Sequence, residues 1–247
     1  PTLHPQSKFS ILASLEETLL GRSDAATDAL ALRDQLRLRN LTPQHALDLL
    51  KAFRQDVTKN RYNNWEELLD YCRYSAMPVG RFVLDVHGEA TSTWEHSDAL
   101  CTALQIINHL QDCGKDYRDI DRVYIPLDDL SAHGLDVRAL AEPAASPSLS
   151  ACLQSLAIRT EKLLPEASLL PPSVADLRLA VETSVIVELA RKLIGLLKTR
   201  DPLSDRVHLS KPYAAMIAAR AAATTLASRA FARAAFTKSS RMMPHER

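Results

Sequence analysis

Four polar side chains recur within one apolar stretch of the sequence, at spacings that place them on the same side of a helix. They are Gln105, Asn108, Asp112 and Asp116. At roughly 100° per residue, these positions fall within a wedge of about 80°, while leucine and isoleucine occupy most of the remaining surface. Carboxylate and amide oxygens suit Mg²⁺, whose coordination is commonly completed by water and substrate phosphates. A diphosphate bridged to this face by Mg²⁺ is therefore one chemistry that the stripe could support.

The alternative is that the stripe is an ordinary solvated helix face. The surrounding sequence is apolar for a surface helix, and the polar residues are not arranged as Glu and Lys pairs. An uncompensated buried carboxylate costs several kcal/mol, so Asp112 and Asp116 need cations or a water-filled cleft beside them. We expect both carboxylates to face a cavity together with Asn108.

A second pair of aspartates with the same spacing, Asp24 and Asp28, follows Gly21 and precedes another apolar run. Acidic residues are favoured at the cap and in the first turn of a helix, where they interact with free N–H groups. We interpret this pair as structural and expect it to be dispensable for metal binding.

The segment 70–82 places Pro78 and Gly80 inside a helical pattern, close to Tyr71, Tyr74 and Ser75. Proline removes a backbone hydrogen bond and glycine weakens a helix interior, so the helix should kink. A kink among small residues makes room for a ligand. It could equally serve only to adjust the packing of two helices.

The elements that must position these residues are predicted to be helices throughout. Only six glycines occur in the 247 residues, and alanine and leucine are abundant, so the composition is typical of an all-α protein. Periodicity predicts helices over 7–20, 26–39, 43–60, 65–87, 97–117, 147–164, 173–199 and 212–236, the seventh beginning with a cap at Ser173. Residues 122–136 are predicted to be an ordered loop and 163–173 a break. No linker composition divides the chain, which favours a single domain.

The composition limits which cellular compartments and which classes of binding partner we expect for the protein. The 30 basic residues balance the 30 acidic ones without a long block of like charge, which argues against a nucleic-acid partner. The four cysteines form no metal-binding or disulfide pattern, and the sequence shows neither a signal peptide nor an apolar run long enough to span a bilayer. We expect a cytoplasmic protein with reduced thiols. A peripheral contact with the inner membrane face is the alternative.

Two segments together resemble the squalene and phytoene synthase family. Residues 53–82 read FRQDVTKNRYNNWEELLDYCRYSAMPVGRF, and residues 104–126 read LQIINHLQDCGKDYRDIDRVYIP, which is similar to the second aspartate-rich motif of the family. The resemblance implies an isoprenoid-synthase-like helical bundle with a central cavity. It also implies that the cavity is lined by Gln105, Asn108, Asp112, Asp116, Asp56, Tyr71, Arg122 and Tyr124. Near the C-terminus, DRVHLSK implies that Arg206 and Lys211 approach the diphosphate.

The family also carries a first aspartate-rich motif on an N-terminal helix, which we do not find in residues 1–23. We expect it upstream of Pro1. Residues 1–247 are accordingly expected to form one domain of this family without that helix.

Two departures from the usual family pattern narrow the expected activity. The sequence has Gln111 where most condensing members have arginine, and Ser-Ala-Met-Pro where most have Val-Ala-Gly. These forms are similar to the branch that consumes presqualene diphosphate in bacterial hopanoid biosynthesis. The resemblance implies ionisation of that substrate, rearrangement of the cation and capture by water to give hydroxysqualene, without NADPH. Enzymes before and after it in the squalene pathway would be its partners. A head-to-head prenyl transferase and a non-catalytic helical partner protein remain the alternatives.

The resemblance also implies roles for individual residues. Asp112, Asp116 and Asn108 would hold Mg²⁺, with Gln105 orienting the metal or bonding the phosphate. Cations would neutralise the diphosphate, and aromatic rings would stabilise the carbocation. The candidate cations are Lys115, Arg122 and Arg206, and the candidate rings are Tyr71, Tyr74 and Phe82. Ser75, Arg81 or Tyr71 could hold the attacking water.

Overall fold

The computed structural model describes residues 3–241, with side chains as far as Phe231. The chain is built of helices, and Arg61 and Val123 form an isolated parallel β-bridge. The longer helices are α1 (Pro5–Leu19), α2 (Thr27–Leu38), α3 (Gln44–Thr58), α4 (Trp65–Ser75), α5 (Met77–Val86), α6 (Trp94–Gln111), α7 (Cys113–Ile120), α9 (Pro147–Glu161), α12 (Leu177–Leu197) and α13 (Lys211–Arg241). Short helices are α8 (Leu127–Ala132), α10 (Leu164–Ala167) and α11 (Leu170–Ser173), with 3₁₀ turns at Thr91–Thr93 and Val137–Ala141. The predicted all-α class is confirmed.

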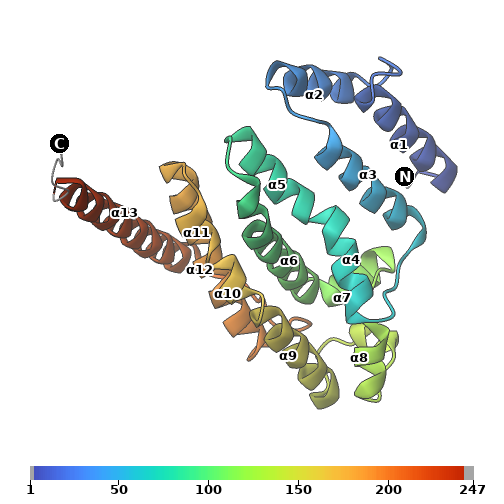
Figure 1. The fold of residues 1–247 in the computed structure, drawn as a ribbon. Coiled ribbons are helices and arrows are strands. Elements are labelled where there is room, and N and C mark those ends of the chain that lie inside the picture. The colour runs from blue at the N-terminus through green and yellow to red at the C-terminus, as the bar shows by residue number, and fades with distance from the viewer. Residues whose placement is uncertain (1–2, 242–247) are drawn as a thin grey trace.

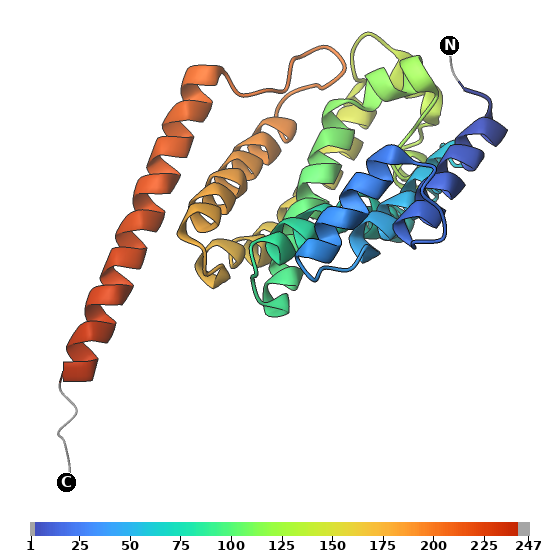
Figure 2. The same cartoon turned by 90° about the horizontal axis from the view of Figure 1, so that it is seen from above.

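The helices follow one another across the molecule (Figure 1). Helices α1–α3 lie along one side, α4–α6 occupy the middle, and α9–α12 lie beyond them. Helix α6 contacts α4, α5, α9, α10 and α12, so it is the central element of the packing. Helix α13 packs mainly on α12 and stands at the outer edge (Figure 2).

Side-chain caps fix where several helices begin. The Asn64 side chain accepts a hydrogen bond from the Glu67 N–H at 2.9 Å, and the Glu67 carboxylate accepts one from the Asn63 N–H at 2.8 Å. Together they satisfy free donors at the start of α4. At the start of α12 the capping residue is Asp176, which accepts a bond from the Leu179 N–H at 2.7 Å. The predicted cap at Ser173 is therefore wrong: Ser173 ends α11, and its hydroxyl donates to the Leu170 carbonyl.

Two helices predicted as continuous are each divided in the structure. The helix predicted over 65–87 separates at Ala76 (φ −120°, ψ −51°) into α4 and α5, with Pro78 in the first turn of α5, where proline is well tolerated. The helix predicted over 97–117 changes direction at Asp112 between α6 and α7. The predicted loop 122–136 contains α8, which begins after Pro126. Residues 163–173, predicted as a break, form α10 and α11.

Buried side chains form a main core and two smaller clusters. The main core includes Ile106, Ile107 and Leu110 from α6 together with residues of α4, α9 and α12. One smaller cluster lies among α5, α6, α10, α11 and α12, and the other among α1, α2 and α3. Cys72, Cys113 and Cys152 are buried free thiols in the main core. No helix in the described part of the chain combines the length and the apolar character needed to cross a bilayer.

Candidate active site

A sharp turn after α7 brings the segment that follows it back against α3 and α4. Asp121 ends α7 in the left-handed conformation (φ 51°), which aspartate tolerates better than most residues. Arg61 donates hydrogen bonds to the carbonyl and carboxylate of Asp121. The Val123 N–H then donates to the Asn60 carbonyl at 2.9 Å. This parallel pairing holds Arg122 and Tyr124 beside the end of α3.

Asp56, Tyr71, Arg122 and Tyr124, which the family resemblance implied would line the site, lie in contact with one another. The Tyr71 hydroxyl donates to Asp56 Oδ2 at 3.2 Å, and one Arg122 nitrogen lies 3.5 Å from Asp56 Oδ1. Arg122 also donates to the Asp56 backbone carbonyl at 2.8 Å and to the Tyr124 hydroxyl at 3.2 Å. The guanidinium therefore joins the end of α3 to the segment after α7.

Four rings lie around this polar centre, and we call Tyr62, Tyr71, His109 and Tyr124 the aromatic group. The His109 and Tyr124 rings are stacked, with centroids 3.5 Å apart and planes at 15°. The Tyr62 centroid lies 5.5 Å from that of Tyr124 and 5.3 Å from that of Tyr71. All four side chains are buried. The four rings therefore pack on one another, and aromatic faces can stabilise positive charge.

Burial determines the protonation of these groups. It raises the pKa of Tyr62, Tyr71 and Tyr124, so the three phenols remain protonated. Burial, and then the nearby Arg122 guanidinium, lower the pKa of His109 to about 3, which keeps the imidazole neutral. Burial also raises the pKa of Asp56, against the opposing effects of Arg122 and Tyr71. The result is a group of neutral rings in contact with one carboxylate–guanidinium pair.

The polar stripe adjoins the aromatic group. Gln105, Asp112 and Asp116 are half-buried, while Asn108 is exposed. The amide nitrogen of Gln105 lies 3.1 Å from His109 Nε2. The Asp116 N–H donates to the Asp112 carbonyl at 2.8 Å, so one turn of helical bonding continues through the junction of α6 and α7. Both aspartates therefore stay near one another despite the change of direction.

The electrostatics of the two aspartates suit a cation. Burial, followed by repulsion from Asp112, raises the pKa of Asp116, and Arg122 and Lys115 compensate only in part. Within residues 3–241 no group of three His, Cys, Asp or Glu side chains could hold a metal ion. Two carboxylates one helical turn apart nevertheless fit Mg²⁺, which often takes one or two protein carboxylates and completes its shell from water and phosphate.

The other predicted residues have different surroundings. Ser75, at the end of α4, has a buried hydroxyl for which the described structure provides no hydrogen-bond partner. The Tyr74 ring lies 5.1 Å from Lys51 Nζ and is half-buried. Arg81 pairs through two nitrogens with Asp98 of α6. Lys115 is exposed on α7.

Gln111, at the end of α6, forms a hydrogen bond with the segment that was predicted to bring Arg206 and Lys211 to the site. The Gln111 amide nitrogen donates to the carbonyl oxygen of Val207, which is buried in the main core. Arg206 and Lys211 are both exposed on either side of this attachment. The glutamine that departs from the usual family arginine thus contacts the basic segment directly.

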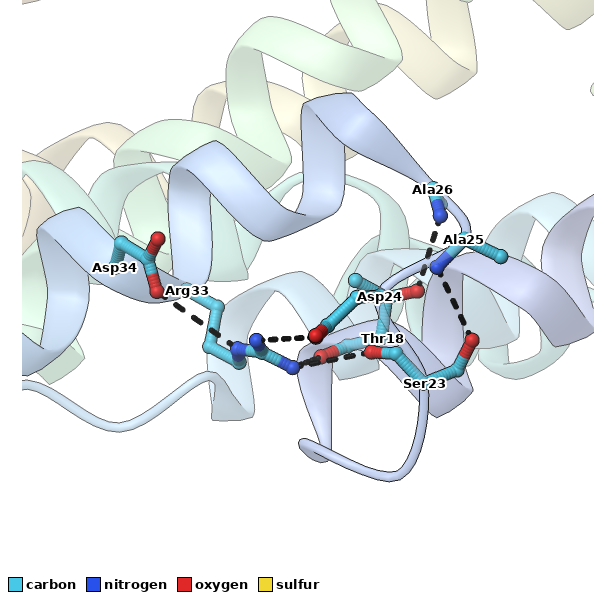
Figure 3. A network of polar contacts seen from close by, with 7 residues as sticks. All are labelled: Thr18, Ser23, Asp24, Ala25, Ala26, Arg33 and Asp34. Atoms are coloured by element: carbon cyan, nitrogen blue, oxygen red, sulfur yellow. Dashed lines mark hydrogen bonds and ion pairs between the residues drawn. The ribbon is translucent and has the colours of Figure 1, made fainter.

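The second aspartate pair lies elsewhere, in the connection between α1 and α2 (Figure 3). The buried Arg33 guanidinium donates to Asp24 Oδ1 at 2.6 Å, to the Thr18 carbonyl at 2.9 Å and to the Ser23 carbonyl at 3.1 Å. Asp28 lies in the first turn of α2, as predicted, whereas Asp24 precedes the helix and serves as a partner for Arg33. Both have a structural explanation.

Sequence reasoning missed His109 and Tyr62. His109 follows Gln105 by four residues and lies at about 40° from it around the helix, beside the polar stripe. That spacing could have identified it, since a histidine among apolar residues at such a position needs a partner. Tyr62 lies between α3 and α4, where no periodic pattern indicates which way a side chain points.

Comparison with known proteins then identifies the family. The squalene/phytoene synthase family model matches residues 9–213. A hydroxysqualene synthase from Sinorhizobium fredii is 52% identical over 232 residues, which cover 94% of this chain and 80% of the relative. The chain belongs to the squalene/phytoene synthase family. The family predicted from the two motifs is confirmed, and membership of it makes the protein an enzyme.

Further members support the same placement within the squalene/phytoene synthase family. The hydroxysqualene synthase of Rhodopseudomonas palustris is 55% identical, covering 87% of this chain and 74% of the relative. A solved squalene synthase from Alicyclobacillus acidocaldarius has 30% identity and a TM-score of 0.70, covering 80% of this chain and 74% of that one. A dehydrosqualene synthase structure, 21% identical with a TM-score of 0.74, shares the fold over 90% of this chain and 79% of its own.

Proposed function

We propose that the protein is a hydroxysqualene synthase, which converts presqualene diphosphate and water into hydroxysqualene and diphosphate. The observation that carries this proposal is its similarity to relatives of that name, which are 52% and 55% identical over most of the chain. The site supports it chemically, because a half-buried aspartate pair adjoins the aromatic group, whose rings are neutral. Such a site can bind a metal–diphosphate at one side and stabilise a carbocation at the other.

Binding of the diphosphate is assigned to the polar stripe and nearby cations. Asp112, Asp116 and Asn108 would hold Mg²⁺, and Gln105 would bond a phosphate oxygen or orient the metal-bound water. When bound, Mg²⁺ would neutralise charge on the leaving diphosphate as the C–O bond breaks. Further neutralising charge comes from Lys115, Arg122, Arg206 and Lys211. This electrostatic stabilisation is the largest expected contribution to the rate.

The aromatic group would act in the next step, when the carbocation forms. The C–O bond electrons leave with the diphosphate, and the resulting cyclopropylcarbinyl cation rearranges by ring opening. The faces of Tyr71, Tyr124 and His109 can stabilise that charge without forming a bond to it, because the phenols remain protonated and buried. The Asp56–Arg122 pair in contact with the rings fixes their orientation.

Capture by water completes the reaction. A water oxygen forms the new C–O bond with its lone pair and releases one proton, which the departing diphosphate can accept. Ser75 is the favoured residue for holding this water, because its buried hydroxyl has no partner among the described residues and would gain one. Tyr71 and Arg81 are the alternatives, although each already has a carboxylate partner.

The direct test is to incubate the purified full-length protein with presqualene diphosphate or with farnesyl diphosphate, each with and without Mg²⁺ and NADPH. Products are identified by mass spectrometry. We expect hydroxysqualene from presqualene diphosphate, dependent on Mg²⁺ and independent of NADPH, and little product from farnesyl diphosphate. Efficient formation of squalene or phytoene from farnesyl or geranylgeranyl diphosphate would instead assign a head-to-head prenyl transferase.

A further inference from the structure

His109 makes contacts on both sides of the site. Its Nε2 lies 3.1 Å from the amide nitrogen of Gln105, on the polar stripe. Its ring stacks on Tyr124 with a centroid distance of 3.5 Å and lies 6.2 Å from the ring of Tyr71. Because a Gln amide nitrogen can only donate, Nε2 accepts this bond and the ring carries its hydrogen on Nδ1. His109 is thus a physical link between the diphosphate side and the cation side.

This link comes at a cost to stability. The Nδ1 atom is buried, and the described structure offers it no hydrogen-bond partner. An apolar side chain of similar size would avoid this cost while still filling the main core. Buried polar atoms of Tyr62, Asp56 and Arg122 also lack partners in the same part of the structure. An unfavourable polar residue at the centre of a site indicates a role beyond packing.

We propose that His109 is a positioning residue that fixes the amide of Gln105 relative to the ring of Tyr124. The contacts continue from Tyr124 through Arg122 to Asp56. The position of the His109 ring therefore affects the positions of side chains across the whole site. This inference rests on the proposed function for its effect on catalysis. The position of the Gln105 amide, however, can be tested without it.

The main variant is His109→Phe, which keeps a ring against Tyr124 and removes both nitrogens. Its melting temperature should equal or exceed that of the wild type, because the unpartnered Nδ1 is gone. Its kcat for presqualene diphosphate should nevertheless fall roughly 10- to 100-fold, as expected from a small misplacement of a binding group. His109→Leu removes the ring as well, and should in addition lower the proportion of hydroxysqualene among the products.

Two measurements separate positioning from packing. Calorimetric titration with inorganic diphosphate and Mg²⁺ should show roughly fivefold weaker binding by His109→Phe, the effect of one lost hydrogen bond. In a Gln105→Ala background the same substitution should cause no further weakening, since both act through one contact. The matched control is His96→Phe, a histidine near the start of α6 whose partner is Glu166, and it should leave kcat and products unchanged.

Crystal structures of the wild type and His109→Phe give the independent check. A displaced Gln105 amide supports the proposal even if the wild type fails to turn over presqualene diphosphate, an outcome that overturns only the proposed function. An unmoved Gln105 amide overturns the positioning role. Additive losses in the Gln105→Ala background would also overturn it, as would a fall in kcat that matches a fall in folded protein.

Discussion

At the scale of single residues, Asp112 and Asp116 combine partial burial with closeness to one another. If they hold Mg²⁺, Asp112→Asn should reduce kcat roughly 10²-fold or more, because a neutral amide cannot replace the charge beside the leaving group. The helical circular dichroism signal should remain unchanged. Asp28→Ala is the matched control from the other aspartate pair, and it should retain full Mg²⁺-dependent activity. An Asp112→Asn enzyme as active as the wild type would contradict the assignment.

The ionised Asp116 carboxylate should lower the free energy of unfolding when no cation is bound. Its pKa is raised by burial and by Asp112, so the folded state holds the proton more tightly than the unfolded state. This loss of stability is absent when the pH is below the pKa of Asp116 in the unfolded state, about 3.9. It is fully present once the pH exceeds the raised pKa of Asp116 in the folded state. Asp116→Asn should therefore melt at a higher temperature than the wild type at pH 7, with the difference disappearing in acid.

Two measurements extend the Asp116 test. Asp119→Asn, at an exposed position of the same helix, should leave the melting temperature unchanged. Adding Mg²⁺ and inorganic diphosphate should stabilise the wild type more than Asp116→Asn. A variant that is less stable than the wild type at neutral pH would show that Asp116 makes favourable contacts instead.

The grouping of several candidate-site residues could be predicted from the sequence, and the residues that were missed share a cause. Helical periodicity alone placed the polar stripe on one face, and motif resemblance brought Asp56, Tyr71, Arg122 and Tyr124 together. Periodicity is silent on residues outside helices, such as Tyr62. Periodicity also does not predict which carboxylate a basic side chain will pair with. Arg81 pairs with Asp98 because α5 packs against α6.

At the scale of elements, the close approach of α5 to α6 depends on Gly80. A β-carbon at Gly80 would lie 2.3 Å from Ser97 Oγ and 2.6 Å from Cys101 Sγ. Gly80→Ala should therefore destabilise the protein by about 1–3 kcal/mol in chemical denaturation, as overpacking typically does. Gly195→Ala, where a β-carbon meets nothing within 4 Å, should stabilise it by about 0.5–1 kcal/mol. Equal effects of the two substitutions would contradict this account of the α5–α6 contact.

The helices themselves were predictable, but their breaks were not. Propensity and periodicity describe interactions within a few residues, so they predicted 65–87 and 97–117 as single helices. The divisions at Ala76 and Asp112 go with tertiary contacts: α4 and α5 each pack on both α3 and α6, and α7 packs on the 3₁₀ turn Val137–Ala141. Helices as short as α8, α10 and α11 are marginal alone and depend on tertiary packing, which a local pattern does not contain.

At the scale of the whole molecule, the packing is unequal between its centre and its edge. Helix α6 contacts five other helices, whereas α13 packs mainly on α12 (Figures 1 and 2). Amide hydrogen exchange should therefore be slowest in α6 and much faster in α13, because local opening of an edge helix exposes less of the core. Comparable protection in both helices would show that α13 is held by more than the contacts described.

The fold class followed from composition, whereas the arrangement of helices required distant contacts. The pairing of Arg61 with Val123 joins residues 62 positions apart, and no sequence signal near either residue indicates the other. Motif resemblance supplied that information indirectly, because it carried the architecture of a family. Elementary patterns therefore predict the elements, and the resemblance predicts their assembly.

The reactivity of the buried cysteines can report how often the folded core opens. Burial raises the pKa of Cys72, Cys113 and Cys152 to about 12 each, so almost no thiolate is present at neutral pH. These cysteines lie in α4, α7 and α9, around the main core. A thiol-specific reagent should modify them only as fast as that core exposes them. Labelling rates would then report how often each part of the folded enzyme opens, without any introduced probe.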